Sequence, residues 1–293
     1  MGSQALETAS TAVQIIGAIA MVCNLLAAFA FGATKPLRSR RYGFVFNLVL
    51  ANTAAPVMAI VHQNRPGKVP LSLMRISISA AQLSVICVAA NRLLALSLPR
   101  ARYNSKITHR RLVAACLLIW AASASLYVPL TCIKAQSLWI IRPVLGFLIL
   151  LFAAILHCAV FRKIAKYGAP VELIPVPEVD KESGPRLRHT RQFMVTFCII
   201  LMAHFVSWIP FCIINVMVYV SGKDYTDHVY LVQVYLKAGV AILLLSSLVN
   251  PFIYWWRFAE FRAGLYNMLF VCHKQYTAEA LEMAIPKIDE GNI

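Results

Sequence analysis

Seven long stretches almost free of charged residues constrain this chain more than any other feature. Six contain no Lys, Arg, Asp or Glu, and they cover 8–34, 42–64, 112–133, 143–161, 192–222 and 238–256. The seventh, 76–98, is interrupted only by Arg92. A helix needs roughly 20 apolar residues to cross a hydrocarbon core of ~30 Å. Core helices of water-soluble proteins are shorter and carry a charged face, so the sequence predicts seven membrane spans.

The composition supports the same conclusion. Hydrophobic residues make up 60% of the 293 residues and charged residues only 14%. A soluble domain carries about a quarter charged residues, so this chain lacks the polar surface that a soluble fold needs. From the stretches we predict an outer tail at 1–11 and spans at 12–34, 42–63, 70–98, 112–132, 139–163, 190–220 and 229–256.

The basic residues are sorted between the two sides of the predicted membrane. The net charge of +16 could indicate nucleic acid binding, but twenty of the 28 Lys and Arg fall in one set of alternate loops and the C-terminal segment. Basic residues concentrate in cytoplasmic loops. We therefore expect the N-terminus outside and the C-terminus in the cytoplasm, and no nucleic acid partner.

Polar side chains inside the spans are the next informative feature. They are costly in hydrocarbon and usually face the bundle interior, so each is a candidate functional residue. They occur in NLVLAN (47–52), NRL (91–93), SWIP (207–210) and SSLVNPFIY (246–254), with Asn24 in the first span and Trp120 in the fourth.

In their order and depth these motifs resemble those of the rhodopsin-like (class A) G-protein-coupled receptors, over nearly the whole chain. NPFIY is similar to the family's NPxxY and SWIP to its CWxP, and NRL stands where the family has DRY. The resemblance implies an all-α membrane protein with a seven-transmembrane bundle at 12–256. It also implies a short cytoplasmic amphipathic eighth helix at 257–272, which contains Phe261-Arg262, and a cytoplasmic tail at 273–293.

The prolines of the sixth and seventh spans are predicted to form hinges. Pro210 removes a backbone hydrogen bond and kinks its helix, and Trp208 lies two residues before it. We favour a switch role for this pair over a simple packed kink. Asn250-Pro251 predicts a second kink. A buried polar network is expected to include Asn24, Asn52, Ser246, Ser247 and Asn250, with helix–helix hydrogen bonding as the plainer alternative.

Arg92 is the only charged residue deep in the third span. An isolated charge there is costly, so it must pair, extend to the membrane surface or face a cavity. The resemblance implies that Arg92 meets the C-terminal helix of a G protein once the sixth helix swings outward. It implies that Tyr254 then turns inward to line the same cavity.

Departures from the family pattern also carry predictions. Asn91 replaces the acidic residue before Arg92, Asn52 replaces the family's aspartate in the second span, and Ala81 replaces a serine that helps to bind sodium. We expect the family's sodium site to be lost, and we hypothesise appreciable basal activity. Gly67 stands where the family has a disulfide cysteine, so that bridge is not expected. Cys272 is a candidate palmitoylation site, with a plain thiol as the alternative.

The ligand pocket is expected near the outer ends of the third and seventh spans, with Trp208 of the sixth span below. Met74 stands where amine receptors have an aspartate. Arg75 and Lys237 could recognise an anionic group, or could instead extend to lipid headgroups. The predicted pocket residues are Met74, Arg75, Ile78, Trp208 and Lys237. NRL together with SSLVNPFIY is also similar to the melatonin-receptor branch.

The resemblance implies a plasma-membrane receptor without catalytic residues, cofactor or metal. Its expected partners are a heterotrimeric G protein, arrestin, membrane lipids and a small or lipid-like ligand. A transporter or channel is the alternative class, but it would be expected to show paired acids, broken helices or inverted repeats. An intramembrane enzyme would need carboxylates near His157 or His204, and no Asp or Glu lies in any predicted span. A non-signalling member of the receptor family stays open.

Overall fold

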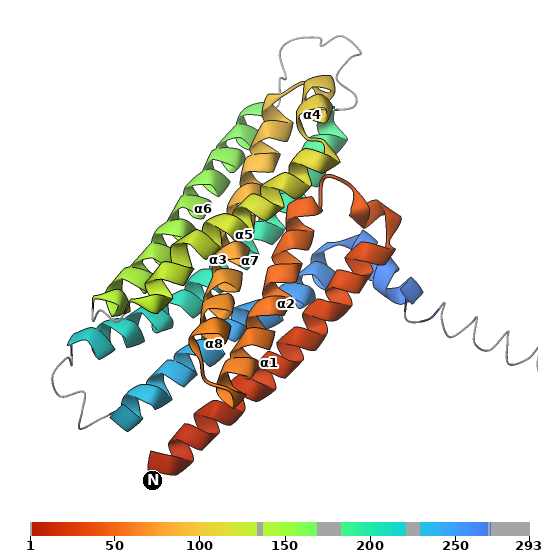
Figure 1. The fold of residues 1–293 in the computed structure, drawn as a ribbon. Helices are drawn as coiled ribbons and strands as arrows, with labels where there is room; N and C mark the ends of the chain where they lie inside the picture. The colour runs from red at the N-terminus through yellow and green to blue at the C-terminus, as the bar shows by residue number, and fades with distance from the viewer. Residues whose placement is uncertain (1, 134–136, 169–182, 221–228, 269, 271–293) are drawn as a thin grey trace, which may run out of the picture.

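The computed structural model describes residues 2–133, 137–168, 183–220, 229–268 and 270 of the 293. Seven long helices cross the length of the molecule, as Figure 1 shows. They are α1 (Gly2–Ala33), α2 (Gly43–Asn64), α3 (Lys68–Ser97), α5 (His109–Cys132), α6 (Leu138–Gly168), α7 (Ser183–Val220) and α8 (Val229–Arg257). Three short elements accompany them: η1 (Lys35–Arg38), α4 (Arg100–Lys106) and a helical segment at 259–268.

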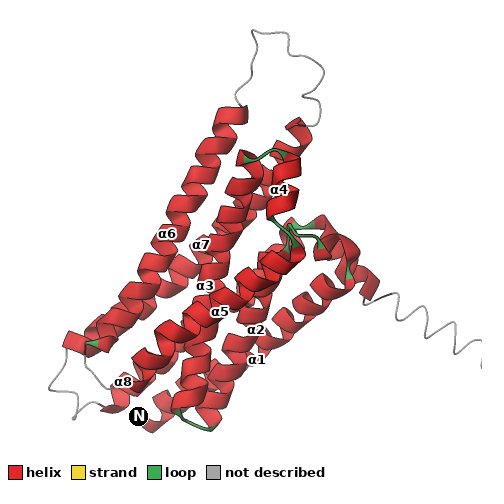
Figure 2. Cartoon of the chain, turned by 45° about the horizontal axis from the view of Figure 1, so that its top comes forward, coloured by secondary structure: helices red, strands yellow, loops and turns green. Residues whose placement is uncertain are grey.

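The long helices form one bundle with α3 at its centre. α3 packs against α2, α5 and α6, and the outer contacts run from α2 through α1, α8 and α7 to α6. We call the end of the bundle that carries η1 and α4 the Arg92 end, and the end where α1 begins the N-terminal end. Figures 1 and 2 show η1, α4 and the 259–268 segment together at the Arg92 end, opposite the N-terminus.

The seven long helices have the length and apolar composition needed to cross a membrane. Their polarity is inverted relative to a soluble protein: Leu117 and Leu118 on α5 are 65% and 69% exposed, while Asn24, Asn52 and Asn250 are fully buried or nearly so. In hydrocarbon, backbone groups must be satisfied within each helix, and polar side chains must turn inward. The described part of the chain is all-α, so the predicted fold class is confirmed.

The helices extend beyond the predicted spans in places. α1 begins at Gly2, so most of the segment expected to be an outer tail continues the first helix. The sequence did not indicate α4 or η1, because both are short, basic and without an apolar stripe. The segment 259–268 is helical and Gly264 in it lies against Thr34 near η1, so close that a Cβ would overlap Thr34 Oγ1. Cys272 and the tail at 273–293 lie outside the described residues.

Candidate functional site

Arg92 lies near the C-terminal end of α3, and its guanidinium contacts neutral groups. It is only 6% exposed, and its Nη2 donates a hydrogen bond of 2.9 Å to the backbone oxygen of Arg41. Its Cζ lies 3.7 Å from the ring centroid of Phe193 on α7. No carboxylate among the described residues pairs with it. A cation over an aromatic face is attracted by the ring quadrupole, so the contact with Phe193 ties α3 to α7 directly.

Seven aromatic residues extend this contact across the Arg92 end, and we call them the aromatic cluster. Its members are Phe31, Tyr42, Phe193, Phe197, Tyr254, Phe258 and Phe261. Neighbouring ring centroids lie between 4.9 Å (Phe193 to Phe197) and 6.2 Å (Tyr254 to Phe261). Edge-to-face and offset contacts at such distances are favourable. The cluster therefore joins α1, the loop before α2, α7 and α8 into one packed unit beside Arg92.

Tyr254 and Tyr42 are both buried within the aromatic cluster. Tyr254 is fully buried, its ring stacks at 5.9 Å on Phe258, and its hydroxyl has no hydrogen-bond partner. Tyr42 was predicted to begin the second span, but it lies just before α2 and outside the membrane-crossing helix, which begins at Gly43. Burial is the main cause that raises the pKa of Tyr42, and the nearby Glu260 carboxylate raises it further. Both tyrosines pack mainly as aromatic rings within the cluster.

Asn91 contacts α4 instead of its neighbour Arg92. The hydroxyl of Tyr103 donates a hydrogen bond of 3.0 Å to Asn91 Oδ1. The residue that replaces the expected carboxylate thus fixes α4, the short helix after α3. Because the Asn91 amide is uncharged, Arg92 lacks the local negative charge that a carboxylate at position 91 would supply.

Trp208 is anchored to α6 near the middle of the bundle. It is 5% exposed, and its Nε1 donates a hydrogen bond of 2.9 Å to the backbone oxygen of Pro143. The indole lies over Gly146, where a Cβ would overlap the ring. Because Pro210 lies two residues away on α7, this contact couples the predicted hinge to α6.

The predicted interior polar network is only partly connected. Asn24 Nδ2 on α1 donates to the backbone oxygen of Ser247 at 2.9 Å, and Ser247 Oγ donates to Asn52 Oδ1 at 3.1 Å. These bonds join α1, α8 and α2. Ser246 donates only within its own helix, to Leu243 O at 2.7 Å. Asn250 is fully buried and neither of its side-chain polar atoms has a partner.

A second buried network connects α2, α3 and α5. Trp120 Nε1 donates to Asn47 Oδ1 at 3.0 Å, and Asn47 Nδ2 donates to Ser84 Oγ at 2.8 Å. The sequence had marked Asn47 and Trp120 as polar residues within spans. It gave no reason to single out Ser84, because one serine in a membrane helix usually bonds its own backbone.

The predicted ligand residues separate into two groups. Lys237 Nζ on α8 donates to Gln63 Oε1 at 2.6 Å and to Ser10 Oγ at 3.1 Å, which turns it toward α1 and α2. Arg75 Nη1 donates to Thr131 Oγ1 at 3.1 Å, which turns it toward α5. The two basic residues therefore do not converge on one ligand group.

The apolar members of the predicted pocket have ordinary packing roles. Met74 is buried against Leu244 and other apolar side chains of α1, α2 and α8, and Ile78 packs on the same cluster. Outside the predicted pocket, Pro251 of the predicted second kink is also buried, directly after Asn250.

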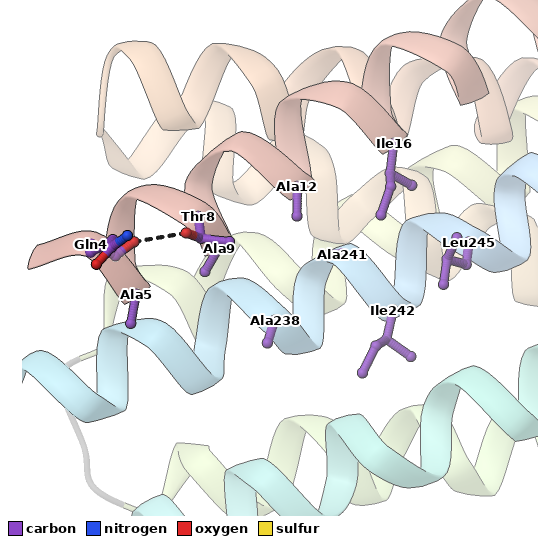
Figure 3. A pocket seen from close by; sticks show the side chains of 10 residues that line it. All are labelled: Gln4, Ala5, Thr8, Ala9, Ala12, Ile16, Ala238, Ala241, Ile242 and Leu245. Carbon is purple, nitrogen blue, oxygen red and sulfur yellow. Dashed lines mark hydrogen bonds between the residues drawn. The ribbon is translucent and has the colours of Figure 1, made fainter. Parts of the chain in front are cut away.

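A groove of about 620 Å³ lies between α1 and α8 at the N-terminal end (Figure 3). Its lining consists of Gln4, Ala5, Thr8, Ala9, Ala12, Ile16, Ala238, Ala241, Ile242 and Leu245. None of these side chains is charged, and Thr8 Oγ1 donates to the backbone oxygen of Gln4. Arg75, Arg92 and Trp208 do not line this groove. Its alanines give it an apolar surface but no hydrogen-bonding side chains that would recognise a polar ligand.

Three further buried or bonded residues did not stand out in the sequence motifs. Phe193 looked like one more apolar residue, and nothing in the pattern indicated that it covers Arg92. Gln82 on α3 is fully buried with both side-chain polar atoms unpartnered. A search for uncharged amides inside spans would have found it. Arg142 stands near the start of the predicted fifth span and was not singled out; it lies within α6 and donates to the backbone oxygen of Leu130.

Comparisons with known proteins agree with this architecture. The sequence profile of the seven-transmembrane receptors (rhodopsin family) matches residues 23–254 of the chain. The adenosine receptor A3 of Bos taurus is 21% identical in an alignment 313 positions long, and the alignment covers 94% of this chain and 94% of that protein. The profile spans most of the bundle, from Cys23 to Tyr254.

Proposed function

Because the chain belongs to the rhodopsin family of seven-transmembrane receptors, a family of multi-pass plasma-membrane proteins without enzymatic activity, we propose that it activates a heterotrimeric G protein. A small ligand that reaches the bundle from outside or from the membrane would shift α7 outward at the Arg92 end. The observation that carries this proposal is Arg92 itself, a buried cation held by two neutral groups, the Arg41 carbonyl before α2 and the Phe193 ring on α7.

We place the Arg92 end in the cytoplasm. The loops and tail expected there contain twenty of the 28 basic residues. Anionic lipids of the inner leaflet attract such basic segments, and basic loops resist translocation. The same end would receive the G protein and arrestin.

Opening this end requires two contacts to break. Outward movement of α7 would remove the Phe193 ring from the Arg92 guanidinium, and the freed guanidinium would turn away from the Arg41 carbonyl. A cation–π contact contributes about 0.5–2 kcal/mol. Such a modest barrier suits an element that must populate two states. Arg92 would then be free to donate to acceptors on the G protein.

Basal activity is part of the proposal. In the absence of a carboxylate near Arg92, the closed state relies on the Phe193 ring, one backbone carbonyl and the aromatic cluster. If Asn91→Asp adds a charge beside Arg92, the closed state should gain stability and ligand-free exchange should fall. Unchanged exchange in this variant would contradict a role for the missing carboxylate.

The ligand is proposed to be a small molecule that enters at the N-terminal end. The adenosine receptor, at 21% identity, is too distant to assign a nucleoside ligand to this chain. The similarity to the melatonin-receptor branch stays a prediction. Membrane lipids are proposed as further partners on the exposed apolar faces of the helices.

The experiment is guanine-nucleotide exchange on purified G proteins of each main class, with the receptor reconstituted in vesicles. The wild-type protein should accelerate exchange for at least one class, and Arg92→Ala should abolish the effect because it removes the guanidinium that is proposed to donate to the G protein. Arg110→Ala is the matched control, since Arg110 is an exposed basic residue at the same end.

The proposal fails if Arg92→Ala retains full exchange while Arg110→Ala behaves like the wild type. Failure of the wild-type protein to activate any class, with or without ligands of several chemistries, would instead favour a non-signalling member of the family. Ion or solute flux through the same vesicles would favour a transporter or channel.

A further inference from the structure

Two arginines from different helices meet at the N-terminal half of the bundle. Arg75 on α3 donates to Thr131 Oγ1 at 3.1 Å, and Arg142 on α6 donates to the backbone oxygen of Leu130. Their acceptors are consecutive residues of α5, so both guanidiniums point to the same turn of that helix. Tyr127 on α5 lies within electrostatic range of both.

This pair has no countercharge among the described residues. Both arginines bond to neutral oxygens, and the sequence contains no Asp or Glu between Glu7 and Glu172. Arg142 Nε is buried without a partner. A guanidinium has five N–H donors, so most of the donors of the pair are not used by the protein. Two like charges held together near hydrocarbon are unfavourable until an anion joins them.

The surroundings of the pair favour an amphipathic ligand. α5 and α6 both pack against α3, and their backbones approach each other closely at few points, although the Arg142 side chain reaches α5. On these two helices Val128, Ile141 and Val144 are each more than 40% exposed, at positions next to the pair. In a membrane such side chains contact acyl chains. A ligand could therefore place its headgroup on the arginines while its tail stays in the bilayer.

From this arrangement we infer that Arg75 and Arg142 form the binding site for a membrane-borne amphiphile with a carboxylate or phosphate headgroup. Arginine binds both groups through paired N–H donors. The inference rests on the proposed receptor function and specifies the chemistry of its ligand. It also replaces the expected pairing of Arg75 with Lys237 by a pairing with Arg142.

The pair has a short route to the predicted switch. Pro143 follows Arg142 directly and accepts the hydrogen bond from Trp208, and Gly146 is one turn further along α6 under the indole. An anion that draws Arg142 toward Arg75 shifts this turn of α6 against Trp208. Binding at the pair therefore acts on the hinge at Pro210 through one turn of helix.

The test is direct binding of radiolabelled oleate to the purified full-length receptor in a neutral maltoside detergent, without a G protein. Wild-type receptor should bind oleate and oleoyl lysophosphatidate saturably, and methyl oleate, which has no charge, should not compete. Arg75→Gln and Arg142→Gln should each weaken binding about tenfold or more, because each removes a charge-assisted hydrogen bond. Lys68→Gln, at an exposed lysine of the same end, should bind like wild type.

Three results would overturn the inference. Methyl oleate could compete as well as oleate, which would make binding purely apolar. Inorganic phosphate could displace oleate at the same concentration that oleate itself requires, which would assign the pair to soluble anions. Both arginine variants could bind normally but unfold at a lower Tm, which would show that the pair serves the fold. Because no G protein is present, each result is separate from the exchange experiment.

Discussion

At the scale of single residues, the contacts of Arg92 explain both why a buried cation is tolerated at this position and how it could act as a switch. Removing a cation from water is costly unless donors and charge are compensated. Here one carbonyl and one aromatic face provide the compensation, at 2.9 Å and 3.7 Å. These two contacts fix the position of the side chain, but they stabilise it less than an ion pair with a carboxylate would.

Replacing Phe193 tests this balance. Phe193→Leu keeps an apolar side chain but removes the ring beneath Arg92, so the closed state should lose about 0.5–2 kcal/mol. Ligand-free nucleotide exchange should rise roughly 2- to 30-fold if the closed state dominates in the wild type. The measurement is initial exchange rate in vesicles at matched receptor density.

Phe197→Leu is the control, because Phe197 packs on Phe193 at 4.9 Å in the same cluster without lying over Arg92. Equal increases in the two variants would mean that general loosening of the aromatic cluster, and not the contact with the cation, controls exchange.

The hydrogen bond from Trp120 to Asn47 allows a test of stability at a single side chain. Trp120→Phe removes the donor and leaves the buried Asn47 Oδ1 without a partner, which costs about 1–3 kcal/mol. The Tm of the purified receptor should fall, with exchange activity retained below the transition. An unchanged Tm would mean that Asn47 Oδ1 finds another donor and that the bond from Trp120 does not contribute to stability.

Sequence reasoning located many of these residues but not their partners. Arg92, Trp208 and the asparagines are recognisable because a polar or proline-linked residue in an apolar helix is rare. Phe193 and Arg142 are not recognisable in the same way. One is apolar among many apolar residues, and the other stands close to a predicted loop. Their roles depend on which helix faces which, and the helical period does not determine that.

At the scale of helices, α6 and α7 are joined by the fit of Trp208 over Gly146. The indole lies where a larger residue at position 146 would place its Cβ, and its N–H bonds the carbonyl of Pro143. The residue type on α6 therefore sets how closely α7 can approach. This is a constraint between two helices, and neither helix shows it alone.

We predict that Gly146→Ala weakens the packing of α7 against α6. The added methyl group overlaps the indole, so Trp208 must move and its bond to Pro143 must weaken. The Tm should fall, and the tryptophan emission should shift as the indole leaves its site. Overpacking a tight interface costs about 1–3 kcal/mol.

Gly32→Ala on α1 is the matched control, since a Cβ there meets no atom within 4 Å. Alanine is the better helix former, so this variant should be as stable as the wild type or slightly more stable. If both variants behave alike, close packing at Gly146 is not what holds α6 to α7.

Helix positions followed from the sequence, whereas helix ends and short elements did not. Charge-free length is enough to locate a span, but a helix can continue past the hydrocarbon, as α1 does back to Gly2. α4 and η1 have seven and four residues and lie where basic residues cluster. Elements of this size are fixed by tertiary contacts such as that of Tyr103 with Asn91.

At the scale of the whole molecule, charged and polar groups occupy different levels along the bundle. Basic residues gather in the segments of the Arg92 end, uncharged amides and hydroxyls occupy the interior, and two arginines meet at the N-terminal half. The bundle topology and the family were predictable, because span count and motif order depend on sequence alone. The division of the ligand residues between two sides of the bundle was not predictable, because it depends on the rotation of α3 and α8 about their axes.

The most direct test of the account is whether α7 moves away at the Arg92 end when a G protein binds. Genetically encoded spin labels at His109 on α5 and Gln192 on α7, both exposed, would report their distance by pulsed electron resonance. A second pair, His109 and Arg38 on η1, serves as a reference.

We predict that nucleotide-free G protein shifts the 109–192 pair to a longer distance, leaves the 109–38 pair unchanged, and has no effect on either pair in Arg92→Ala. An identical 109–192 distance with and without a G protein that demonstrably binds would contradict the account.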